Sequence, residues 1–550
     1  MRIFYCTCAI LALLAQSAGA QTDGGYTIFV RGIPIGRENI SVQAGADGTT
    51  VTSQGSATAP ISSVFRHVEY RYGADGNPRS FAFDGQIGGA DVSLRTTFLN
   101  GSAATEGLQN KTPLNVTQPF SPGAVVLPTG MFSGFVHLAR RLASAKAGDE
   151  IPAFVVPRTE IRSRVVTVSA ERMQRATELV DVRRYELSFI DAAGETVVNV
   201  TTSATGDLLR VSIPSQLVEF VRDDFAGATS RTDVHSNPGD VAVLIPAPGF
   251  NLGATVTIPA KAAGAPASVR RPAVVLVGGP ETHDRDTIVA GVPAFGQLAG
   301  TLANAGFIVV RYDRRGSGQS GGRSESATLG DYADDVRTMV KWLADRKDVD
   351  GKRITVIGYD TGAWLAMLAA SRDNRIAALV SLAAPSSSGA DFALEQQQLQ
   401  FDRMRTPADE RDARSALQKQ LNAAVLSGKG WDRIAPELRK QADTPWFQSF
   451  LAFDPAKVAD NVDAHWLLVH GDLDKEVDVA HAQRLTTAAR NGDAESVDLV
   501  VVKGVNHLLQ PAVTGDVSEY QKLAAKGVSP DVSSAVVGWL QRTLPESRRN

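Results

Sequence analysis

Residues 354–370 read ITVIGYDTGAWLAMLAA, and the fold class can be inferred from this segment. Its first four residues are all β-branched, which predicts a buried strand, and the residues after Gly362 have the apolar composition of a buried helix. Gly358 and Gly362 flank the junction and let the strand and the helix approach closely in a sharp turn. Such an elbow holds the side chain at its tip above the sheet, beside the amides that begin the helix. The sequence therefore predicts that Asp360 stands at the tip of a strand–helix elbow.

The chain around this elbow alternates between short apolar runs and longer amphipathic stretches. This alternation is typical of a doubly wound, mostly parallel sheet that is covered by helices. Residues 386–459 interrupt the rhythm with polar helical sequence, in the place where such folds carry a lid. The expected strands are Ala273–Val277, Phe307–Arg311, Arg353–Ile357, Ala377–Leu382, His465–Val469 and Val497–Val502, and the expected helices are Ala294–Ala305, Leu329–Arg346, Thr361–Ala370 and Ser533–Leu544.

The N-terminal part of the chain follows a different pattern. Between residues 25 and 233, short segments rich in β-branched and aromatic residues are separated by turn signals such as Asn100-Gly101. Strands at hairpin spacing favour an antiparallel barrel or curved sheet, interrupted by one helix at Gly130–Ala145. We therefore expect a β-rich domain over residues 21–238 and an α/β domain over residues 239–550, with its lid at about 386–459.

The first 20 residues have the features of a secretory signal peptide. One positive charge at Arg2 precedes an apolar run, and Ala18-Gly19-Ala20 supplies a cleavage site with small residues. The run is shorter than the roughly 20 residues that a membrane span needs, so no stable membrane anchor is expected after cleavage. Both cysteines of the chain, Cys6 and Cys8, lie in this segment, which excludes disulfides and thiol chemistry from the mature protein. The expected location is periplasmic or secreted.

Composition and charge narrow the classes of partner. The formal net charge is −3, and Lys and Arg are scattered among Asp and Glu without a basic block, so nucleic acid is not an expected partner. The histidines His283, His465, His470 and His481 lack metal-ligand spacing and are expected to pack or to titrate at the surface. The sequence therefore predicts a small-molecule substrate or ligand, with neither a metal nor a cofactor.

Two further loops carry residues that complete a catalytic pattern. Asp474 lies in a G-x-x-D-x-x-V loop after one strand, and His507 follows the next strand. We prefer Asp474 over Asp472 as the acid, because it lies deeper in the loop and can turn back to His507. Upstream, the backbone amides of Gly279 and Thr361 are the expected donors of an oxyanion hole.

Five segments of residues 249–544 carry further motifs: His283-Asp284-Arg285-Asp286, the run Tyr312–Ser320, the lid start Glu395-Gln396-Gln397, the loop Gly471–Val477 and Asn506–Gln510. Together these motifs resemble those of secreted bacterial esterases related to dienelactone hydrolases and serine aminopeptidases. The resemblance implies an α/β-hydrolase fold, preceded by a β-rich domain, and hydrolysis of carboxylic esters. It places the nucleophile, acid and histidine positions at Asp360, Asp474 and His507.

The nucleophile position departs from that family, which has G-H-S-x-G where this chain has Tyr359 and Asp360. Two carboxylates beside His507 would raise the pKa of the imidazole and favour its protonated form, which compromises a serine-type mechanism. An aspartate here is natural in haloalkane dehalogenases and epoxide hydrolases, yet Thr361 stands where the halide-binding tryptophan is usual. The lid, residues 386–459, contains no tyrosine to protonate an epoxide oxygen.

Three interpretations remain open at the level of the sequence. The first is a hydrolase of ester-type bonds of small acyl substrates that uses an Asp-His-Asp variant of the triad. The second is a catalytically silent binding protein with an α/β-hydrolase fold. The third is a haloalkane dehalogenase or epoxide hydrolase, for which Trp364, Trp431 and Trp446 are the candidate halide donors.

Overall fold

The computed structural model describes residues 20–30, 33–58, 61–175, 178–191, 194–216, 218–225, 235–260, 270–279, 284–324, 327–520, 522–523 and 527–545. The expected signal peptide therefore lies outside the described residues, apart from its last position. The chain forms two compact units, one of Met1–Glu171 with Asp181–Asp223 and one of Arg172–Val180 with Asp224–Asn550. Among the helices of the described residues, none combines the length and the hydropathy that a membrane span requires.

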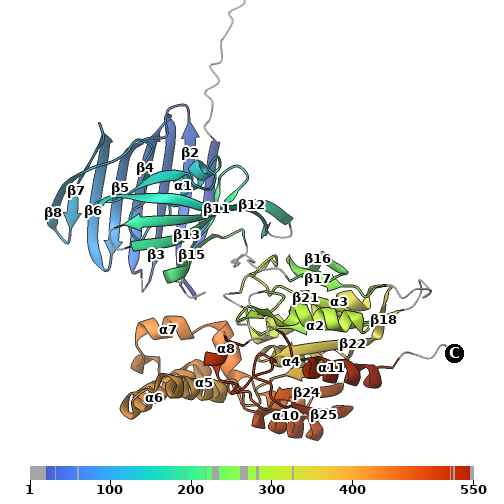
Figure 1. The fold of residues 1–550 in the computed structure, drawn as a ribbon. Helices are drawn as coiled ribbons and strands as arrows, with labels where there is room; N and C mark the ends of the chain where they lie inside the picture. Colours follow the sequence, from blue (N-terminus) through green and yellow to red (C-terminus); the bar gives the residue numbers. More distant parts are fainter. Residues whose placement is uncertain are drawn as a thin grey trace, which may run out of the picture. The chain divides into compact units, whose positions relative to one another are not determined.

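The first unit is built on a single 15-stranded sheet, in which the end of strand β11 and the start of strand β12 fall within Arg172–Val180 and so are assigned to the second unit. Strands β1 to β8 lie side by side in chain order, strands β15 to β9 do the same, and antiparallel pairing of β1 with β15 joins the two runs. Strands β8 and β9 stand at opposite ends of this order. Of the two architectures that the sequence left open, a barrel and a curved sheet, the described strands therefore form the curved sheet (Figure 1). The strands are β1 (Ala20–Val30), β2 (Ile33–Gly45), β3 (Gly48–Ala57), β4 (Ser63–Gly73), β5 (Pro78–Ile87), β6 (Ala90–Leu99), β7 (Ser102–Gln109), β8 (Thr112–Pro119), β9 (Val125–Val126), β10 (Glu150–Val155), β11 (Thr159–Arg175), β12 (Glu178–Asp191), β13 (Gly194–Ser203), β14 (Leu208–Ile213) and β15 (Val218–Arg222).

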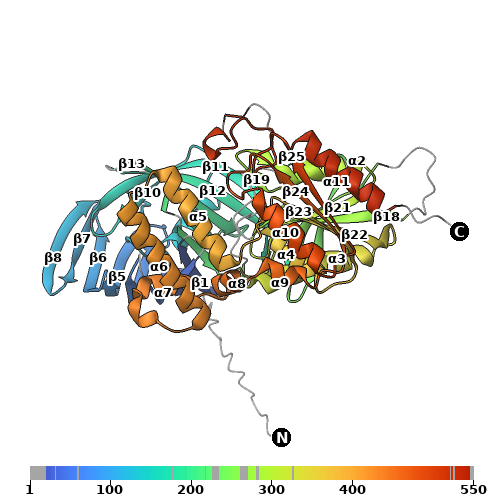
Figure 2. The same ribbon diagram turned by 90° about the horizontal axis from the view of Figure 1, so that it is seen from below.

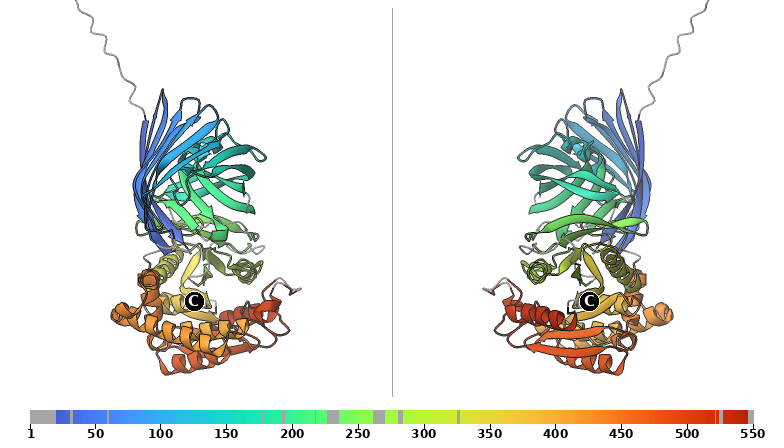
Figure 3. Two further views of the ribbon diagram at one scale, coloured as in Figure 1. Left: turned by 90° about the vertical axis from the view of Figure 1, so that its left-hand side faces the viewer. Right: turned by 90° about the vertical axis from the view of Figure 1, so that its right-hand side faces the viewer.

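The core of this unit lies on one face of the sheet, against helix α1 (Phe135–Leu142). Phe135 of α1 stacks on Phe189 of β12, while the ring of His137 stacks on Tyr72 of β4 at a centroid distance of 3.5 Å. Both runs of strands thus contact the same short helix, and the sheet curls around it (Figure 3).

The second unit has the α/β-hydrolase fold that the sequence predicts. Its eight-stranded sheet has the order β16-β17-β21-β18-β22-β23-β24-β25, in which β17 runs antiparallel to its neighbours and the strands from β21 onward are parallel. The large antiparallel sheet of the first unit precedes it in the chain. The strands are β16 (Asp240–Ala247), β17 (Phe250–Thr257), β18 (Arg271–Val277), β21 (Ile308–Tyr312), β22 (Val349–Tyr359), β23 (Ile376–Leu382), β24 (His465–Gly471) and β25 (Ser496–Val502), and a separate two-stranded ribbon pairs β19 (Ile288–Val289) with β20 (Val292–Pro293).

Helices cover both faces of this sheet, as Figure 2 shows. Helices α2 (Ala294–Asn304) and α11 (Pro530–Thr543) pack on one face, and α3 (Leu329–Ala344), α4 (Gly362–Ala370) and α10 (Ala480–Asn491) pack on the other. Within β18, Val275 faces one core and Val274 the other. Burial on both faces explains why the central strands are continuous runs of Val and Ile rather than alternating sequences.

The interruption expected at residues 386–459 is a group of helices between β23 and β24. They are α5 (Gly389–Met404), α6 (Ala408–Ser427), α7 (Pro436–Ala442), α8 (Pro445–Ala452) and α9 (Pro455–Ala459). Ser388 caps α5 by accepting a hydrogen bond from the amide of Asp391, so this helix begins immediately after the loop that leaves β23.

Candidate active site

Asp360 lies at the turn between β22 and α4, in the left-handed backbone region with φ of +53°. Its amide donates to the carbonyl of Leu382 at 2.9 Å, which ties the turn to the neighbouring strand β23. A Cβ atom on Gly358 would lie 2.4 Å from Cα of Ala363, and one on Gly362 would lie 2.3 Å from the carbonyl oxygen of Val277. Both glycines are therefore required by close packing, and the turn is the sharp elbow that the sequence predicts.

The loops after β24 and β25 bring Asp474 and His507 together. Nδ1 of His507 lies 2.9 Å from Oδ2 of Asp474, and Asp474 is 2% exposed. The other carboxylate oxygen of Asp474 accepts the amides of Glu476 and Val477 at 2.9 and 2.8 Å, which fixes the side chain in the loop. Asp472, the alternative acid, instead accepts the amide of Gly504 and is exposed.

His470, at the end of β24, also contacts the acid and was not recognised as a site residue from the sequence. Its Nε2 lies 2.7 Å from the carbonyl of Val477 and 3.3 Å from Oδ2 of Asp474, and the side chain is 1% exposed. Nε2 must therefore carry the proton, since both neighbours are acceptors. The signal in the sequence is the four-residue spacing from His470 to Asp474, which becomes meaningful only when the loop folds back on the strand.

The electrostatics of the pair favour a charged histidine. Burial lowers the pKa of His507, but the negative charges of Asp474, which also accepts its hydrogen bond, and of Asp360 outweigh burial and raise it to about 9. Burial likewise opposes ionisation of Asp474, yet the charge of His507 and the hydrogen bond from His470 lower the pKa of this carboxyl well below its usual range. At neutral pH the pair is thus an imidazolium hydrogen-bonded to a carboxylate.

Tyr359, the last residue of β22, contacts both the backbone and the ring of His507. Its hydroxyl donates to the backbone carbonyl of His507 at 3.1 Å, and the two rings lie 5.3 Å apart. Burial, followed by the charges of Asp360 and Asp474, raises the pKa of Tyr359 well above its ordinary value, so the phenol stays protonated as a donor.

The two expected oxyanion donors lie on segments that the structure brings together. Gly279 is buried just beyond the end of β18, and Thr361 is 2% exposed at the start of α4. Gly362 packs directly on the carbonyl of Val277, two residues before Gly279. The roles of the two amides remain a prediction that this packing supports.

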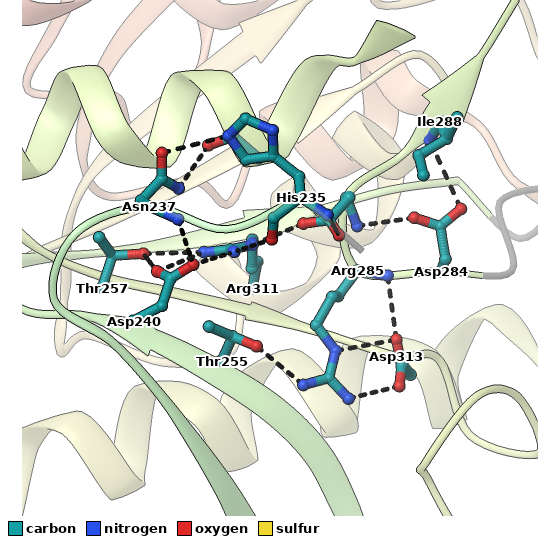
Figure 4. Close-up of polar contacts among 12 residues, drawn as sticks. His235, Asn237, Asp240, Thr255, Thr257, Asp284, Arg285, Ile288, Arg311 and Asp313 are labelled. Atoms are coloured by element: carbon teal, nitrogen blue, oxygen red, sulfur yellow. Dashed lines mark hydrogen bonds and ion pairs between the residues drawn. The ribbon is translucent and has the colours of Figure 1, made fainter. Parts of the chain in front are cut away.

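A buried network of ion pairs anchors the segment that follows Gly279 in the chain (Figure 4). Arg285 forms a two-point ion pair with Asp313, at 3.0 and 2.5 Å, from the turn after β21. Arg311 of β21 contacts Asp286 and Asp240, each at 2.7 Å. Both arginines are at most 2% exposed. Because a buried charge that loses its partner is costly, the pairing holds this segment firmly against β16 and β21.

Two of the other histidines singled out in the sequence contact protein groups. His465 lies against Ser496 and Glu495, and His481 is buried beside Ser386. His283 and the proline at position 280 lie outside the described residues. Within the part of the chain that the structure describes, no group of three or more His, Cys, Asp or Glu side chains is arranged to hold a metal ion.

Comparison with known proteins agrees with this fold. The family model described as the alpha/beta hydrolase fold matches residues 272–511. Esterase EstD of Thermotoga maritima is 28% identical over 239 residues, which are 43% of this chain and 54% of that protein. The human mitochondrial palmitoyl-protein thioesterase ABHD10 is 27% identical over 115 residues, 21% of this chain and 34% of that protein. The chain therefore spans about half, or less, of the length of the curated relatives that it matches.

Solved structures of similar fold include the α/β-hydrolase GrgF from Penicillium sp. sh18, 19% identical with a TM-score of 0.37, which aligns 56% of this chain with 99% of that one. The Pyrococcus furiosus esterase Pf2001 is also 19% identical, with a TM-score of 0.36 and coverage of 57% and 98%. An α/β-hydrolase fold with esterases among its relatives supports assignment of the second unit to the hydrolases.

Proposed function

We propose that the second unit hydrolyses carboxylic esters at a site in which Asp360 faces the substrate and His507, paired with Asp474, moves the protons. The observation that carries this proposal is the 2.9 Å contact between His507 and Asp474, beside a half-buried carboxylate at the elbow. The charge of Asp360 contributes to the raised pKa of His507, which supports proximity of the two groups. A buried histidine whose pKa is raised by the charges of two carboxylates is a feature that is concentrated at functional sites, which favours a working site over a silent framework.

In the first step, the carboxylate of Asp360 attacks the ester carbonyl and forms a mixed anhydride. The bond to the leaving oxygen breaks, and the imidazolium of His507 gives its proton to that oxygen, which leaves as the alcohol. His507 is then neutral, and its pKa falls because Asp360 no longer carries a charge. The imidazole is therefore a base at the stage when a base is needed.

In the second step, His507 removes a proton from water, and the resulting hydroxide adds to Cγ of Asp360. The oxyanion forms on the side chain of Asp360, next to the amides of Gly279 and Thr361. Its collapse expels the acyl group as a carboxylate and leaves Asp360 as a carboxylic acid, which loses its proton to solvent. One ester and one water thus give one carboxylate, one alcohol and one proton, and His507 is again protonated.

This mechanism favours substrates with good leaving groups. An acid with a pKa of about 9 can protonate a departing phenolate effectively, whereas an alkoxide is far more basic and leaves slowly even with such help. We therefore expect aryl esters of small acids to react much faster than the corresponding alkyl esters.

Dehalogenation and epoxide opening receive less support. Nε1 of Trp364 donates to the carbonyl of Pro385 at 2.8 Å, and the side chain is fully buried, so this tryptophan cannot hold a halide. Trp446 stacks on Phe447 and Phe450 within the lid helix α8. These contacts assign packing roles to two of the three tryptophans considered from the sequence.

The test is hydrolysis of 4-nitrophenyl acetate by wild type and by Asp360→Asn, Asp360→Ser and Asp474→Asn. We expect Asp360→Asn to lose at least about 100-fold in kcat, because the nucleophile is gone, and Asp472→Asn to serve as an unaffected control on the same loop as Asp474. A single turnover in heavy-oxygen water should place label in Asp360. An inactive wild type with an active Asp360→Ser variant would mean instead that the framework has lost its nucleophile, which is the binding-protein alternative.

A further inference from the structure

A second cluster of chemically complementary side chains lies where the lid begins. Ser386 follows β23 and is half-buried, with its hydroxyl oxygen 3.1 Å from Nδ1 of His481 in the first turn of α10. Nε2 of the same ring lies 3.4 Å from Oε2 of Glu395, in α5. A hydroxyl, an imidazole and a carboxylate thus lie in a row, and none of them belongs to the candidate site of Asp360, Asp474 and His507.

The contacts of His481 fix the position of its proton. The amide of Ser386, the hydroxyl of Ser386 and Nη2 of Arg484 all approach Nδ1, at 3.0, 3.1 and 3.0 Å. Nδ1 must therefore carry the lone pair, and the proton of the neutral ring resides on Nε2, toward Glu395. Of the three donors, only the hydroxyl has a proton that a neutral imidazole can take up during nucleophilic attack.

The surroundings keep this imidazole neutral and hold its carboxylate in place. Burial lowers the pKa of His481, which is 6% exposed, and the positive charge of Arg484 lowers it further against the opposing effect of Glu395. Ser387 donates its hydroxyl to Oε1 of Glu395 at 2.7 Å, which orients the carboxylate. His481 is thus available as a base at neutral pH, whereas His507 is protonated.

We propose that Ser386, His481 and Glu395 form a second acyl-transfer site, which accepts activated carboxylic esters and uses the hydroxyl of Ser386 as nucleophile. The hydroxyl of Ser386 is hydrogen-bonded to the imidazole, as in an activated serine, and the carboxylate of Glu395 lies within ion-pair range of the other ring nitrogen. This site does not depend on the function proposed for Asp360, and either can be present without the other.

The chemistry at this site needs no group beyond those present. Oγ of Ser386 forms a bond to the ester carbonyl carbon while its proton passes to Nδ1 of His481. Arg484 donates through Nε to Oγ of Ser386 at 3.0 Å and is exposed, so its guanidinium can stabilise the oxyanion. The intermediate expels the alkoxide, which takes the proton from His481, and leaves an acyl-serine. Water then loses a proton to His481 and attacks the acyl carbon, and Ser386 leaves with that proton.

The test is covalent labelling of the full chain with a fluorophosphonate, which serine displaces at phosphorus with loss of fluoride. We expect a phosphonyl adduct on Ser386, located by fragment masses of the peptide that spans residues 376–403, in both wild type and Asp360→Asn. Ser386→Ala should lose the adduct, and His481→Gln should slow labelling at least tenfold. Ser388→Asn is the matched control, because it changes a serine two residues away and keeps an acceptor that caps α5.

Folding of each variant is checked by its thermal unfolding midpoint, so that loss of labelling is not confused with loss of structure. Absence of an adduct on Ser386 in folded wild type, under conditions that label a serine protease completely, would overturn the proposal. Labelling that persists in folded His481→Gln at the wild-type rate would overturn it too. Neither result bears on Asp360. Because 4-nitrophenyl acetate is also an activated ester, the role of Asp360 is read from ester turnover in the Asp360→Asn and Asp360→Ser variants combined with Ser386→Ala, so that turnover at Ser386 does not contribute.

Discussion

At the scale of single residues, the charge on His507 depends mainly on Asp474. Burial disfavours the imidazolium, and the pKa is nevertheless about 9 because Asp474, and less strongly Asp360, attract the positive charge. Asp474→Asn removes the larger attraction and leaves burial in place, so the pKa of His507 should fall below its wild-type value. Titration of the His507 ring by NMR measures this shift. The same titration in Asp472→Asn, which removes an exposed carboxylate from the same loop, should leave the pKa unchanged.

The same raised pKa makes stability depend on pH. A histidine whose pKa is higher in the folded protein than its ordinary value of about 6.5 binds its proton more tightly when folded. The resulting stabilisation is fully present below about pH 6.5 and is lost as the pH rises through about 9, and it is on the order of 3 kcal/mol for this shift. We expect wild type to lose more unfolding free energy than His507→Gln between pH 6.5 and 9.5. Equal losses in urea titrations at the two pH values would contradict this expectation.

The candidate site residues predicted from the sequence all lie in local motifs, whereas residues that come together only in the folded chain were missed. Asp360, Asp474 and His507 lie in the loops after β22, β24 and β25, each with a recognisable pattern, and the structure places Asp474 against His507. The contact between Ser386 and His481 joins residues 95 positions apart and has no local pattern.

At the scale of the element, the elbow depends on the absence of a side chain at Gly358. A methyl group there would lie 2.4 Å from Cα of Ala363, whereas the nearest atoms to a methyl group on Gly351, in the same strand, are 3.8 Å away. Gly358→Ala should therefore destabilise the protein by about 1–3 kcal/mol through overpacking, and Gly351→Ala should cost much less. Urea unfolding midpoints of the two variants make the comparison within one strand. Similar midpoints would show that the elbow can relax.

The bounds of helices and strands were predicted best in the second unit, where helices bury both faces of the sheet. The long apolar runs of the second unit gave strands and helices within a few residues of the observed ones. The helix expected at Gly130–Ala145 is instead the shorter α1, Phe135–Leu142, because Gly130 has φ of +78° and cannot lie in a right-handed helix. Glycine at position 130 is consistent with a turn, but the composition of the segment alone did not distinguish a turn from the start of the helix.

At the scale of the whole molecule, the sequence predicted the strands of the first unit but not their pairing. The central pair joins Tyr26 of β1 with Arg222 of β15, which are far apart in the chain. The pairing of neighbouring strands in hairpins follows from local turn signals. The pairing of β1 with β15 instead follows from the shared core around α1, which no local pattern reveals. The choice between a closed barrel and an open curved sheet therefore required the structure.

Two separate cores predict two unfolding transitions. Among the described residues, the side chains that pack around α1 and those that pack on the eight-stranded sheet form clusters with no member in common. Phe220→Ala and Phe295→Ala remove equally large buried rings, one from each unit, and each should cost about 3–5 kcal/mol. Calorimetry should show that each variant lowers one transition and leaves the other in place. A single transition that both variants lower together would mean that the two units unfold cooperatively, since a shared unfolding step transmits the loss of either core to the whole chain.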